Sequence, residues 1–428
     1  MATPAKTTPA KTTPAERLDK ITQDKLCIGC GLCASFAGED AIGFGMNDEG
    51  DLIPFARDGL TDPLMDQVEQ MCPSLRVEGL PQDLIDTSPH HDLVWGAYHG
   101  LKTGHAGDAT LRHIGSTAGV LTAIGCYLLA SHQVDFIAHV KAPDHDDDNP
   151  PHHGVATVST TEDDVIAAAG SRYGPTAPLI NIMSLLDRGQ PFALIAKPCD
   201  LNAMRNLAHL DERVNRLIKY WLTPVCGGFS PDEGYQQFLD RHAIPKDEVK
   251  ALRYRGYGCP GPTQLTMASG ETNDIHYLDF WGDDESHWVL PLRCKICPDG
   301  IGEGADLAAS DTWDGGSPDR VESETDLGLN HMIIRTKQGM DLVKDAVKAG
   351  YLTITKEAAI EDLNRTQPHQ VKKKYAGLAR AHGLAAAGSV APALVNIRAE
   401  ALSDAAGDGA YHHEKQGTMK RALAIKPS

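Results

Sequence analysis

The 428-residue sequence has no apolar run that approaches the roughly 20 residues needed to span a bilayer. No signal-peptide hydrophobic region precedes the first cysteines, so we expect a soluble, cytoplasmic protein without a membrane span. Positive charge is also scarce, because 58 acidic residues outnumber 40 basic ones and give a formal charge of −18. This balance argues against a nucleic-acid partner and suits a small-molecule or basic partner.

Cysteine, in contrast, is abundant. The chain has ten cysteines, and in the reducing cytosol these are expected to be ligands rather than disulfides. The length predicts two or three domains, and the hydrophobic fraction of 41% is enough for a sizeable core. Residues 2–15 repeat a TPAKT unit that cannot bury apolar surface, so we expect residues 1–17 to form a disordered tail.

The first four cysteines follow a cluster-binding pattern. Lys25–Cys33 reads KLCIGCGLC, which is C-x2-C-x2-C, and a Cys-Pro pair follows further along the chain. Three thiolates at this spacing wrap a loop around one face of an iron–sulfur cluster, and a remote Cys-Pro commonly supplies the fourth ligand. A zinc knuckle usually has paired CxxC units or histidines instead. The pattern therefore favours a [4Fe-4S] cluster, in a ferredoxin-like segment over residues 18–80, held by Cys27, Cys30, Cys33 and Cys72.

The middle of the chain alternates between strand and helix patterns. Buried strands are predicted over 134–140, 192–197 and 217–225, and helices over 161–169 and 178–186. This alternation predicts an α/β fold whose helix-covered, mostly parallel sheet occupies residues 90–250. A strand over 332–336 and a helix over 339–348 belong to a smaller α+β domain over 251–383. We expect residues 384–428 to be a peripheral tail.

Two segments are candidates for holding a cofactor. His113–Leu129, HIGSTAGVLTAIGCYLL, brings small residues to the start of an apolar helix, whose free N–H groups can cradle a phosphate. A helix simply capped by Ser116 or Thr117 is an equally good interpretation.

The second segment is Tyr254–Thr263, YRGYGCPGPT. Its three glycines and two prolines predict a sharply turned loop in which Arg255 and Tyr257 are suited to hold a phosphate or stack on a ring. A purely structural loop is the alternative.

Three other features receive a plainer interpretation. The acidic, proline-containing segment Asp144–His153, DHDDDNPPHH, could chelate a divalent metal, but nothing in the sequence fixes the ligand geometry, so a solvated turn is favoured. Cys126 lies in an apolar helix pattern and Cys259 in the glycine-rich loop. Both are expected to be packed thiols, because free cysteine usually behaves as a small hydrophobe.

Four cysteines then remain, namely Cys199, Cys226, Cys294 and Cys297. Two of them follow predicted strands, where functional residues of α/β sheets gather. The other two form a CxxC hairpin within Leu292–Trp313. Four thiolates from three segments suit either a second [4Fe-4S] cluster or a tetrahedral zinc site, and spacing does not separate the two. The presence of a first cluster favours a second one.

The motifs KLCIGCGLC, GSTAGVLTA, KPCD, CGGF, YRGYGCPGP and RCKICPDG…ADLAASDTW occur in this order. Together they resemble the coenzyme F-420 hydrogenase/dehydrogenase beta-subunit family over residues 20–380. That family includes deazaflavin-coupled hydrogenase and formate dehydrogenase subunits, and ferredoxin-dependent reductases of chlorophyll pigments. The resemblance implies a flavin, usually FAD rather than FMN, beside one or two [4Fe-4S] clusters, with the second set of cysteines as the flavin-proximal cluster.

The resemblance also implies flavin contacts. Ser116, Thr117 and Gly119 match the family's small-residue flavin loop, and Arg255, Gly256 and Gly258 match its fixed loop near the flavin. Two departures are present: STAG stands where many relatives have a double glycine, and Cys259 stands where relatives often have an aromatic residue. Both could reshape the pocket, so the substrate is not carried over.

These observations support two main hypotheses of function. The first is an iron–sulfur flavoprotein reductase that takes electrons from ferredoxin or a similar one-electron donor and reduces a conjugated small organic substrate. Tyr173, His113 and Lys197 are candidate proton donors, and Tyr173 and Lys197 are also candidate cofactor contacts. The alternative is an electron-relay beta subunit that exchanges electrons with coenzyme F-420 beside a partner catalytic subunit. A homo-oligomer is compatible with either, and a binding protein with two zinc sites is a third hypothesis.

Overall fold

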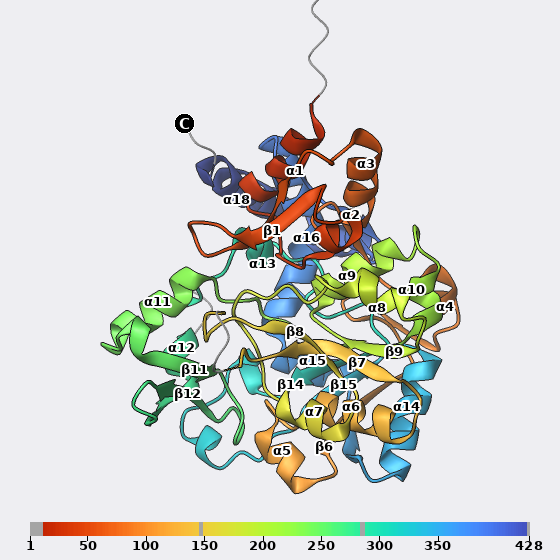
Figure 1. Cartoon of the computed structure of the whole chain (residues 1–428). Coiled ribbons are helices and arrows are strands. Elements are labelled where there is room, and N and C mark those ends of the chain that lie inside the picture. The colour runs from red at the N-terminus through yellow and green to blue at the C-terminus, as the bar shows by residue number, and fades with distance from the viewer. Residues whose placement is uncertain (1–11, 145–148, 283–286, 426–428) are drawn as a thin grey trace, which may run out of the picture.

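The computed structural model describes residues 12–144, 149–282 and 287–425 (Figure 1). The predicted disordered tail lies mostly outside these residues, but its last part is helical. Helix α1 (Pro14–Gln23) begins with Thr13 as its N-cap in a capping box with Glu16, and a proline occupies its first turn. Ordered structure therefore starts before Leu18, because the end of the TPAKT repeat itself supplies a helix N-terminus.

The N-terminal segment is a small assembly of helices around a hairpin. Arg17 in α1 forms ion pairs of 2.6 Å with Asp66 and Glu69 in α3 and so joins these two helices. The elements in chain order are α1, α2 (Leu32–Ala37), β1 (Ile42–Met46), β2 (Leu52–Ala56), α3 (Asp62–Met71), β3 (Arg76–Glu78), α4 (Gln82–Asp86), β4 (His90–Asp92) and β5 (Gly96–Tyr98).

The centre of the molecule is a sheet of eight strands. Their spatial order is β16 (Leu352–Glu357), β6 (Gly100–Ala106), β15 (Asn330–Ile334), β14 (Leu307–Asp311), β10 (Ile218–Pro224), β9 (Phe192–Ile195), β7 (Phe136–Lys141) and β8 (Val155–Ser159). Strands β14, β10, β9 and β7 are mutually parallel, and β6 runs in the same direction. Strands β15, β16 and β8 run the other way. The predicted α/β fold with a mostly parallel sheet is confirmed.

Helices cover both faces of this sheet. Alternate residues of one strand point to opposite faces, so Phe136 packs in one core cluster and Ile137 in another. One face carries α5 (Ala109–Ile114), α6 (Val120–Ala130), α7 (Glu162–Ala167) and α14 (Lys337–Lys348), and the other carries α8 (Ile182–Asp187), α9 (Pro198–Leu207) and α10 (Arg213–Leu217) (Figure 1). Among the described residues, no helix has both the length and the apolar character to cross a membrane.

A smaller α+β unit lies at the side of the sheet, drawn in green in Figure 1. Its three antiparallel strands are β11 (Val249–Arg253), β12 (Pro262–Met267) and β13 (Thr272–His276), accompanied by α11 (Asp232–Arg241) and α12 (Tyr277–Trp281). Its own core contains Tyr235, Phe238 and Tyr254. A smaller α+β unit is thus present, but its predicted bounds of 251–383 are wrong. The unit lies within residues 232–281, whereas the strand and helix predicted to belong to it are β15 and α14, which join the central sheet because β15 pairs with β14 and with the distant β6.

The C-terminal segment packs more closely than expected. Helices α15 (Ile360–Thr366) and α16 (Pro368–Ala386) are followed by β17 (Ala393–Val395), α17 (Ala399–Ala406) and α18 (Asp408–Ile425). Strand β17 pairs in parallel with β3, and Leu26, Leu384 and Ala422 share one core cluster. The expectation that residues 384–428 form a peripheral tail therefore does not describe residues 384–425, which join the two ends of the chain (Figure 1).

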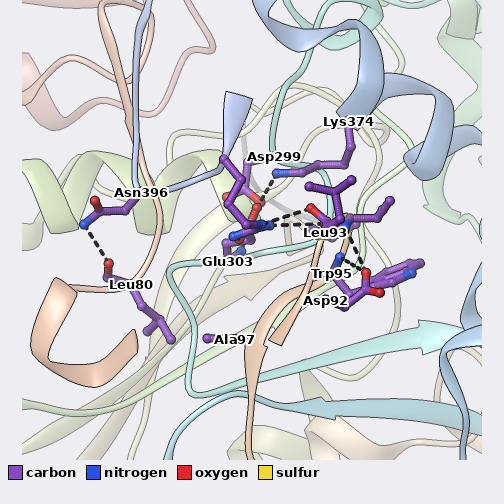
Figure 2. Close-up of polar contacts among 12 residues, drawn as sticks. Leu80, Asp92, Leu93, Trp95, Ala97, Asp299, Glu303, Lys374 and Asn396 are labelled. Atoms are coloured by element: carbon purple, nitrogen blue, oxygen red, sulfur yellow. Dashed lines mark hydrogen bonds and ion pairs between the residues drawn. The ribbon is translucent and has the colours of Figure 1, made fainter. Parts of the chain in front are cut away.

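Buried polar contacts anchor this segment, as Figure 2 shows. Arg398 Nη1 lies 2.7 Å from Glu303 Oε2, and Arg398 Nε donates to the carbonyl oxygen of Leu93 at 2.9 Å. Lys374 of α16 forms an ion pair with the other oxygen of Glu303, and Asn396 Nδ2 donates to the carbonyl oxygen of Leu80 at 3.1 Å. Glu303 follows the CxxC hairpin, so this network connects the hairpin's loop to the C-terminal helices.

Candidate functional site

The first four cysteines converge on a small apolar cavity at the N-terminal end of the molecule. Cys27, Cys30 and Cys33 come from the turn before α2 and from its first residues, and Cys72 directly follows α3. Gly29 in this turn has φ +67°, and a Cβ there would lie 2.8 Å from the carbonyl oxygen of Leu52. The structure therefore brings together the four cysteines that the sequence grouped, with a glycine where the turn requires one.

This cavity is unfavourable for free thiolates. Burial raises the pKa of Cys27 to about 12 and also raises the pKa of Cys72. Without a compensating cation these groups stay protonated, whereas a bound metal centre supplies the positive charge that holds thiolates in such a place. The chemistry of the donor set thus fits an iron–sulfur cluster.

The second four cysteines also come together, from three distant segments. Cys199 lies in the first turn of α9 after β9, and Cys226 follows β10. Cys294 lies in α13 (Leu292–Lys295), and Cys297 completes the hairpin. Burial, together with the charges of Cys294 and Cys297, raises the pKa of Cys226 to about 12, and Cys226 and Cys297 also act on the pKa of Cys199. The four side chains are therefore close enough to act as one ligand set.

Helix α16 supports this second set. Gln370 Nε2 donates to the carbonyl oxygen of Cys226 at 2.7 Å, and Lys373 Nζ donates to that of Gly227 at 3.0 Å. These bonds attach the loop after β10 to α16.

The two sets of cysteines are adjacent. Arg293, next to Cys294, donates from Nη2 to the carbonyl oxygen of Pro73, next to Cys72, at 3.0 Å. Buried Asp200 lies near both sets, because its charge adds to the effect of burial in raising the pKa of Cys30 and of Cys199. A hydrogen bond and a shared charged neighbour thus connect the two sets.

A cavity of about 320 Å³ opens beyond the carboxyl ends of β9, β10 and β14. This volume is in the range of sites for small molecules and cofactors, and strand ends of parallel sheets are where such sites form. Six residues predicted from the sequence to contact a cofactor line it, namely Ser116, Thr117, Gly119, Tyr173, Lys197 and Arg255. Cys226 of the second set lines it as well.

Arg255 is the centre of the polar network in this cavity. Its side chain is 3% exposed. Nη2 donates to Thr117 Oγ1 at 2.7 Å, and the guanidinium contacts both oxygens of Asp311 at 3.1 and 3.2 Å. Burial opposes the charge, but Asp311 raises the pKa of Arg255 well above its usual value, so the cation persists. Trp313 covers the guanidinium with its ring centroid 4.7 Å away.

Asp311 is a site residue that sequence reasoning did not single out. It ends β14 within the motif ADLAASDTW, and its Oδ1 accepts a hydrogen bond from the hydroxyl of Thr117. Thr117 has φ +145°, which is unusual for a β-branched residue. The bonds from Thr117 to Asp311 and Arg255 hold it there. The sequence did contain one signal for Asp311, namely an acidic residue directly at the end of an apolar strand pattern.

The start of α6 forms another wall of the cavity. Its N-cap is Gly119 without a side-chain hydrogen bond, so the alternative of a cap by Ser116 or Thr117 is wrong. Ser116 Oγ instead accepts from the backbone N–H of Ser171 at 2.5 Å. Val120 and Leu121, in the first turn of α6, line the cavity. An uncapped N-terminus of this kind favours an anionic group.

Lys197 and Tyr173 complete the predicted contacts. Lys197 Nζ lies 2.8 Å from Asp200 Oδ2. Burial opposes its charge, but Asp200 raises the pKa of Lys197 above its usual value, so a cation faces the cavity beside the second set. Tyr173 Oη accepts from Arg255 Nη1 at 3.4 Å.

Indole groups in the wall offer further donors. Trp281 Nε1 and Trp288 Nε1 are buried and have no hydrogen-bond partner within the described part of the chain, and both residues line the cavity. Unpaired buried donors are uncommon. Together with the cations and the α6 N-terminus, they fit an anionic, ring-bearing cofactor such as a flavin nucleotide.

Other predicted residues lie outside the cavity wall. Gly256 (φ +113°) and Gly258 (φ +129°) shape the loop that positions Arg255 and do not line the cavity. Tyr257 is 45% exposed and packs on Arg253, while His113 lies beside Tyr257 with ring centroids 6.0 Å apart. The structure does not bring the last two side chains to the cavity.

The two cysteines left out of the ligand sets are packed, as predicted. Cys126 is fully buried in α6, and Cys259 is 1% exposed. Residues 145–148 of the acidic segment lie outside the described residues. The histidines that end this segment, His152 and His153, are 0% and 2% exposed, so the expectation of a solvated turn is wrong for them.

Comparison with known proteins identifies the family. Residues 101–184 match the N-terminal part, and residues 189–359 the C-terminal part, of the coenzyme F-420 hydrogenase/dehydrogenase beta subunit, together well over half of the chain. The chain belongs to this family. It is a family of oxidoreductase subunits, which indicates a redox role. The matched regions contain most of the residues that line the large cavity and all of the second set of cysteines, whereas the first set lies before them.

Two individual relatives are informative about extent and fold. An uncharacterized protein of Methanocaldococcus jannaschii is 23% identical over 218 residues, or 49% of this chain and 55% of that protein. This chain thus spans about half the length of the curated relative that it matches. A chain of the xenon-derivatised F-420-reducing [NiFe] hydrogenase complex of Methanosarcina barkeri matches with a TM-score of 0.52 and 17% identity over 68% of this chain and 95% of that chain. At this identity the likeness shows the fold alone.

Proposed function

We propose that this chain is an iron–sulfur flavoprotein that relays electrons as the beta subunit of a hydrogenase- or formate dehydrogenase-type complex, with coenzyme F-420 as the partner of its flavin. The observation that carries the proposal is the shared wall: Cys226 belongs to the second set of cysteines and also lines the cavity that contains Arg255 and Lys197. A metal centre at this set would lie directly against a molecule bound in the cavity.

The residues divide into two kinds of task. The first set, Cys27, Cys30, Cys33 and Cys72, and the second set, Cys199, Cys226, Cys294 and Cys297, would each hold a [4Fe-4S] cluster. A flavin supplies the conversion between one-electron transfer and hydride transfer. In this account residues 18–80 form the ferredoxin-like relay segment, and the central sheet and the smaller α+β unit both contribute to the cavity wall.

The cavity's own groups bind and orient the cofactor. Arg255 and the first turn of α6 supply positive charge for a phosphate, and Ser116, Thr117 and Gly119 keep that turn open. FAD and FMN both carry a phosphate that this end would hold, and the preference for FAD follows from the family resemblance. Lys197 keeps its proton because of Asp200, so its Nζ can donate a hydrogen bond inside the cavity.

A catalytic partner subunit is part of the proposal. The solved structure that this chain resembles belongs to an F-420-reducing hydrogenase complex, which contains other subunits. In such an assembly the first set of cysteines would receive electrons from the partner, and the second set would pass them to the flavin.

A second candidate function is a standalone ferredoxin-dependent reductase of a conjugated small organic molecule. The observation that favours it is that both complete four-cysteine sets lie in this one chain. Such an enzyme would need no clusters from a partner.

The test uses the anaerobically purified chain with reduced methyl viologen as the electron donor. It follows two acceptors, the bound flavin and added coenzyme F-420. The relay proposal predicts loss of the deazaflavin's visible absorbance when coenzyme F-420 is added, and at least a ~100-fold slower rate in Cys226→Ser. Cys126→Ser, which changes a packed thiol, should react as the unchanged protein does. If F-420 stays oxidised while the bound flavin is reduced at full rate, F-420 is not the acceptor and the standalone reductase is favoured.

A further inference from the structure

A separate polar cluster lies where residues 150–154 meet the start of α11. His152 and His153 are buried, and Asp232 is the first residue of that helix. One nitrogen of each imidazole and one carboxylate oxygen of Asp232 lie within 4.8 Å of one another. None of the three lines the large cavity, so this cluster is distinct from the site described above.

The histidine nitrogens in this cluster lack ordinary partners. His152 Nδ1 and His153 Nε2 are buried without a hydrogen bond to any described residue. His152 Nε2 lies 2.8 Å from Asp232 Oδ1, yet this contact does not have the alignment of a hydrogen bond. Buried ring nitrogens normally have a partner. Two adjacent imidazoles without one indicate a ligand that accepts nitrogen lone pairs.

The surrounding residues hold this arrangement in place. The ring of His152 stacks on that of Tyr235, with centroids 4.0 Å apart and 14° between the planes. Tyr254 Oη donates to the carbonyl oxygen of His152 at 2.6 Å, and Arg172 Nη2 donates to that of His153 at 3.0 Å. The rings are therefore preorganised by contacts other than those between the three candidate ligands, as supporting shells of metal sites are.

We propose that His152, His153 and Asp232 bind one divalent transition-metal ion of the zinc class. Two imidazole nitrogens and one carboxylate oxygen are a common donor set for such ions. Each ring has a buried nitrogen without a hydrogen bond to any described residue, and a neutral imidazole can offer such a nitrogen to a metal ion. Asp232 is 25% exposed, which leaves room for water as a further ligand.

Nearby charges affect how tightly this site is expected to bind a metal ion. Lys246 Nζ lies 3.4 Å from Asp232 Oδ2, the oxygen that does not face His152, and the charges of Lys246 and Arg172 act on both histidines. These cations oppose a dication. Removal of the Lys246 charge should therefore tighten metal binding, whereas a change of Asp232 should weaken it.

The metal would link two parts of the fold. His152 and His153 belong to the connection between β7 and β8 of the large sheet, and Asp232 belongs to the smaller α+β unit. Ser230, two residues before Asp232, donates its N–H to the carbonyl oxygen of the cavity residue Tyr173 at 2.7 Å. A bound ion would thus fix the smaller unit against the sheet beside the cavity.

The experiment uses the intact, cofactor-loaded chain and zinc as the probe. The protein is equilibrated with Zn²⁺, desalted, and analysed by mass spectrometry for zinc and iron, with the flavin measured by absorbance. We expect about one zinc per chain in addition to the iron. Asp232→Asn should reduce zinc at least ~10-fold with iron and flavin unchanged, and Lys246→Gln should lower the zinc Kd severalfold. Asp240→Asn, an exposed change in the same helix, should behave as the unchanged protein does.

Thermal unfolding gives a second readout. Added zinc should raise the Tm of the unchanged protein, because an ion that binds only the folded state stabilises it, and should leave that of Asp232→Asn unmoved. The proposal is overturned if the unchanged protein takes up no zinc, or if Asp232→Asn retains as much zinc as the unchanged protein. Asp232→Asn is nearly isosteric, so it should not disturb the fold. Lys246→Gln probes the same site by a gain of zinc affinity, so no substitution of a buried histidine is needed.

Discussion

The two sets of cysteines differ in how they are built and in what they border. The first comes mainly from one short turn before α2 and surrounds a small apolar cavity. The second is assembled from the ends of β9 and β10 and from α13, and it contributes Cys226 to the wall of the 320 Å³ cavity. A closed, apolar set can only pass electrons to a neighbour, whereas a set at a cavity wall can exchange them with a bound molecule. Under the proposed function, the first set would therefore relay electrons and the second set would exchange them with the bound molecule.

The largest expected effect separates these two roles directly. Cys226→Ser should lose about half of the iron and sulfide and slow reduction of the bound flavin at least ~100-fold. Cys30→Ser should lose a similar amount of iron but keep the flavin, because its set does not touch the cavity. Iron, sulfide and flavin contents and stopped-flow absorbance measure both. Full iron content in both variants would contradict the comparison, and Cys126→Ser is the matched control.

The second expected effect concerns stability. Glu303 is 3% exposed and pairs with Lys374 (Figure 2) and also with Arg398. Glu303→Gln leaves the buried Lys374 and the partly exposed Arg398 without their partner, which should cost about 3–5 kcal/mol of unfolding free energy. Because Glu303 follows the hairpin of Cys294 and Cys297, iron should leave the second set before the first during denaturant titration. Glu414→Gln, which changes a partly exposed ion pair with Arg380, is the control and should cost about 1 kcal/mol or less.

The same carboxylate gives a pH dependence. Burial on its own would raise the pKa of Glu303, but Lys374 and Arg398 lower it to about 2. A folded-state pKa below the unfolded value contributes stability above the unfolded pKa, and this contribution is lost as the pH falls toward the folded value. Between about pH 5 and pH 2, the unfolding midpoint of the unchanged protein should therefore fall more steeply than that of Glu303→Gln. Parallel pH profiles of the two proteins would contradict this assignment.

A smaller effect sharpens the role of the cavity. Arg255→Lys keeps the positive charge but loses the two-pronged contact with Asp311 and the bond to Thr117. We expect flavin to be retained about 10–100-fold more weakly with iron content unchanged. Equilibrium dialysis of the flavin measures it. Tyr257→Phe, in the same loop but exposed, should retain flavin normally, and equal loss in both variants would show that the loop's fold rather than Arg255 is responsible.

The smallest expected effect tests whether one charge acts on both sets of cysteines. Asp200 lies near Cys30 and Cys199. Asp200→Asn removes one negative charge next to both sets, so both cluster reduction potentials should rise by tens of millivolts, since charge near a cluster tunes its potential. Redox titration followed by electron paramagnetic resonance measures each potential. A shift in only one potential would mean that the sets are electrostatically separate.

The sequence predicted best what is local. The spacing of Cys27, Cys30 and Cys33 and the strand patterns over β7, β9 and β10 depend on neighbours within a few residues, and their predicted positions agree with the structure. The grouping of the second set and most of the cavity wall came from the order of motifs and the family resemblance rather than from spacing.

What the sequence did not predict depends on distant contacts. Asp311 gains its role from Arg255 and Thr117, which lie far from it in the chain. His152 looked solvated because its neighbours are polar, yet Tyr235 of α11 covers its ring.

The C-terminal segment looked peripheral because its helices pack through small residues instead of an apolar stripe. A Cβ on Gly383 of α16 would lie 2.5 Å from the carbonyl oxygen of Lys415 in α18. Such close packing of two helix backbones leaves little hydrophobic periodicity in the sequence.

The central claim is that two iron–sulfur clusters and a flavin occupy the sites built by the two sets of cysteines and the cavity. The most direct test is quantitation of iron, sulfide and flavin in the anaerobically purified chain, together with its visible spectrum. The account predicts about eight iron, eight sulfide and one flavin per chain. A colourless protein with zinc in place of iron and with no flavin would contradict it.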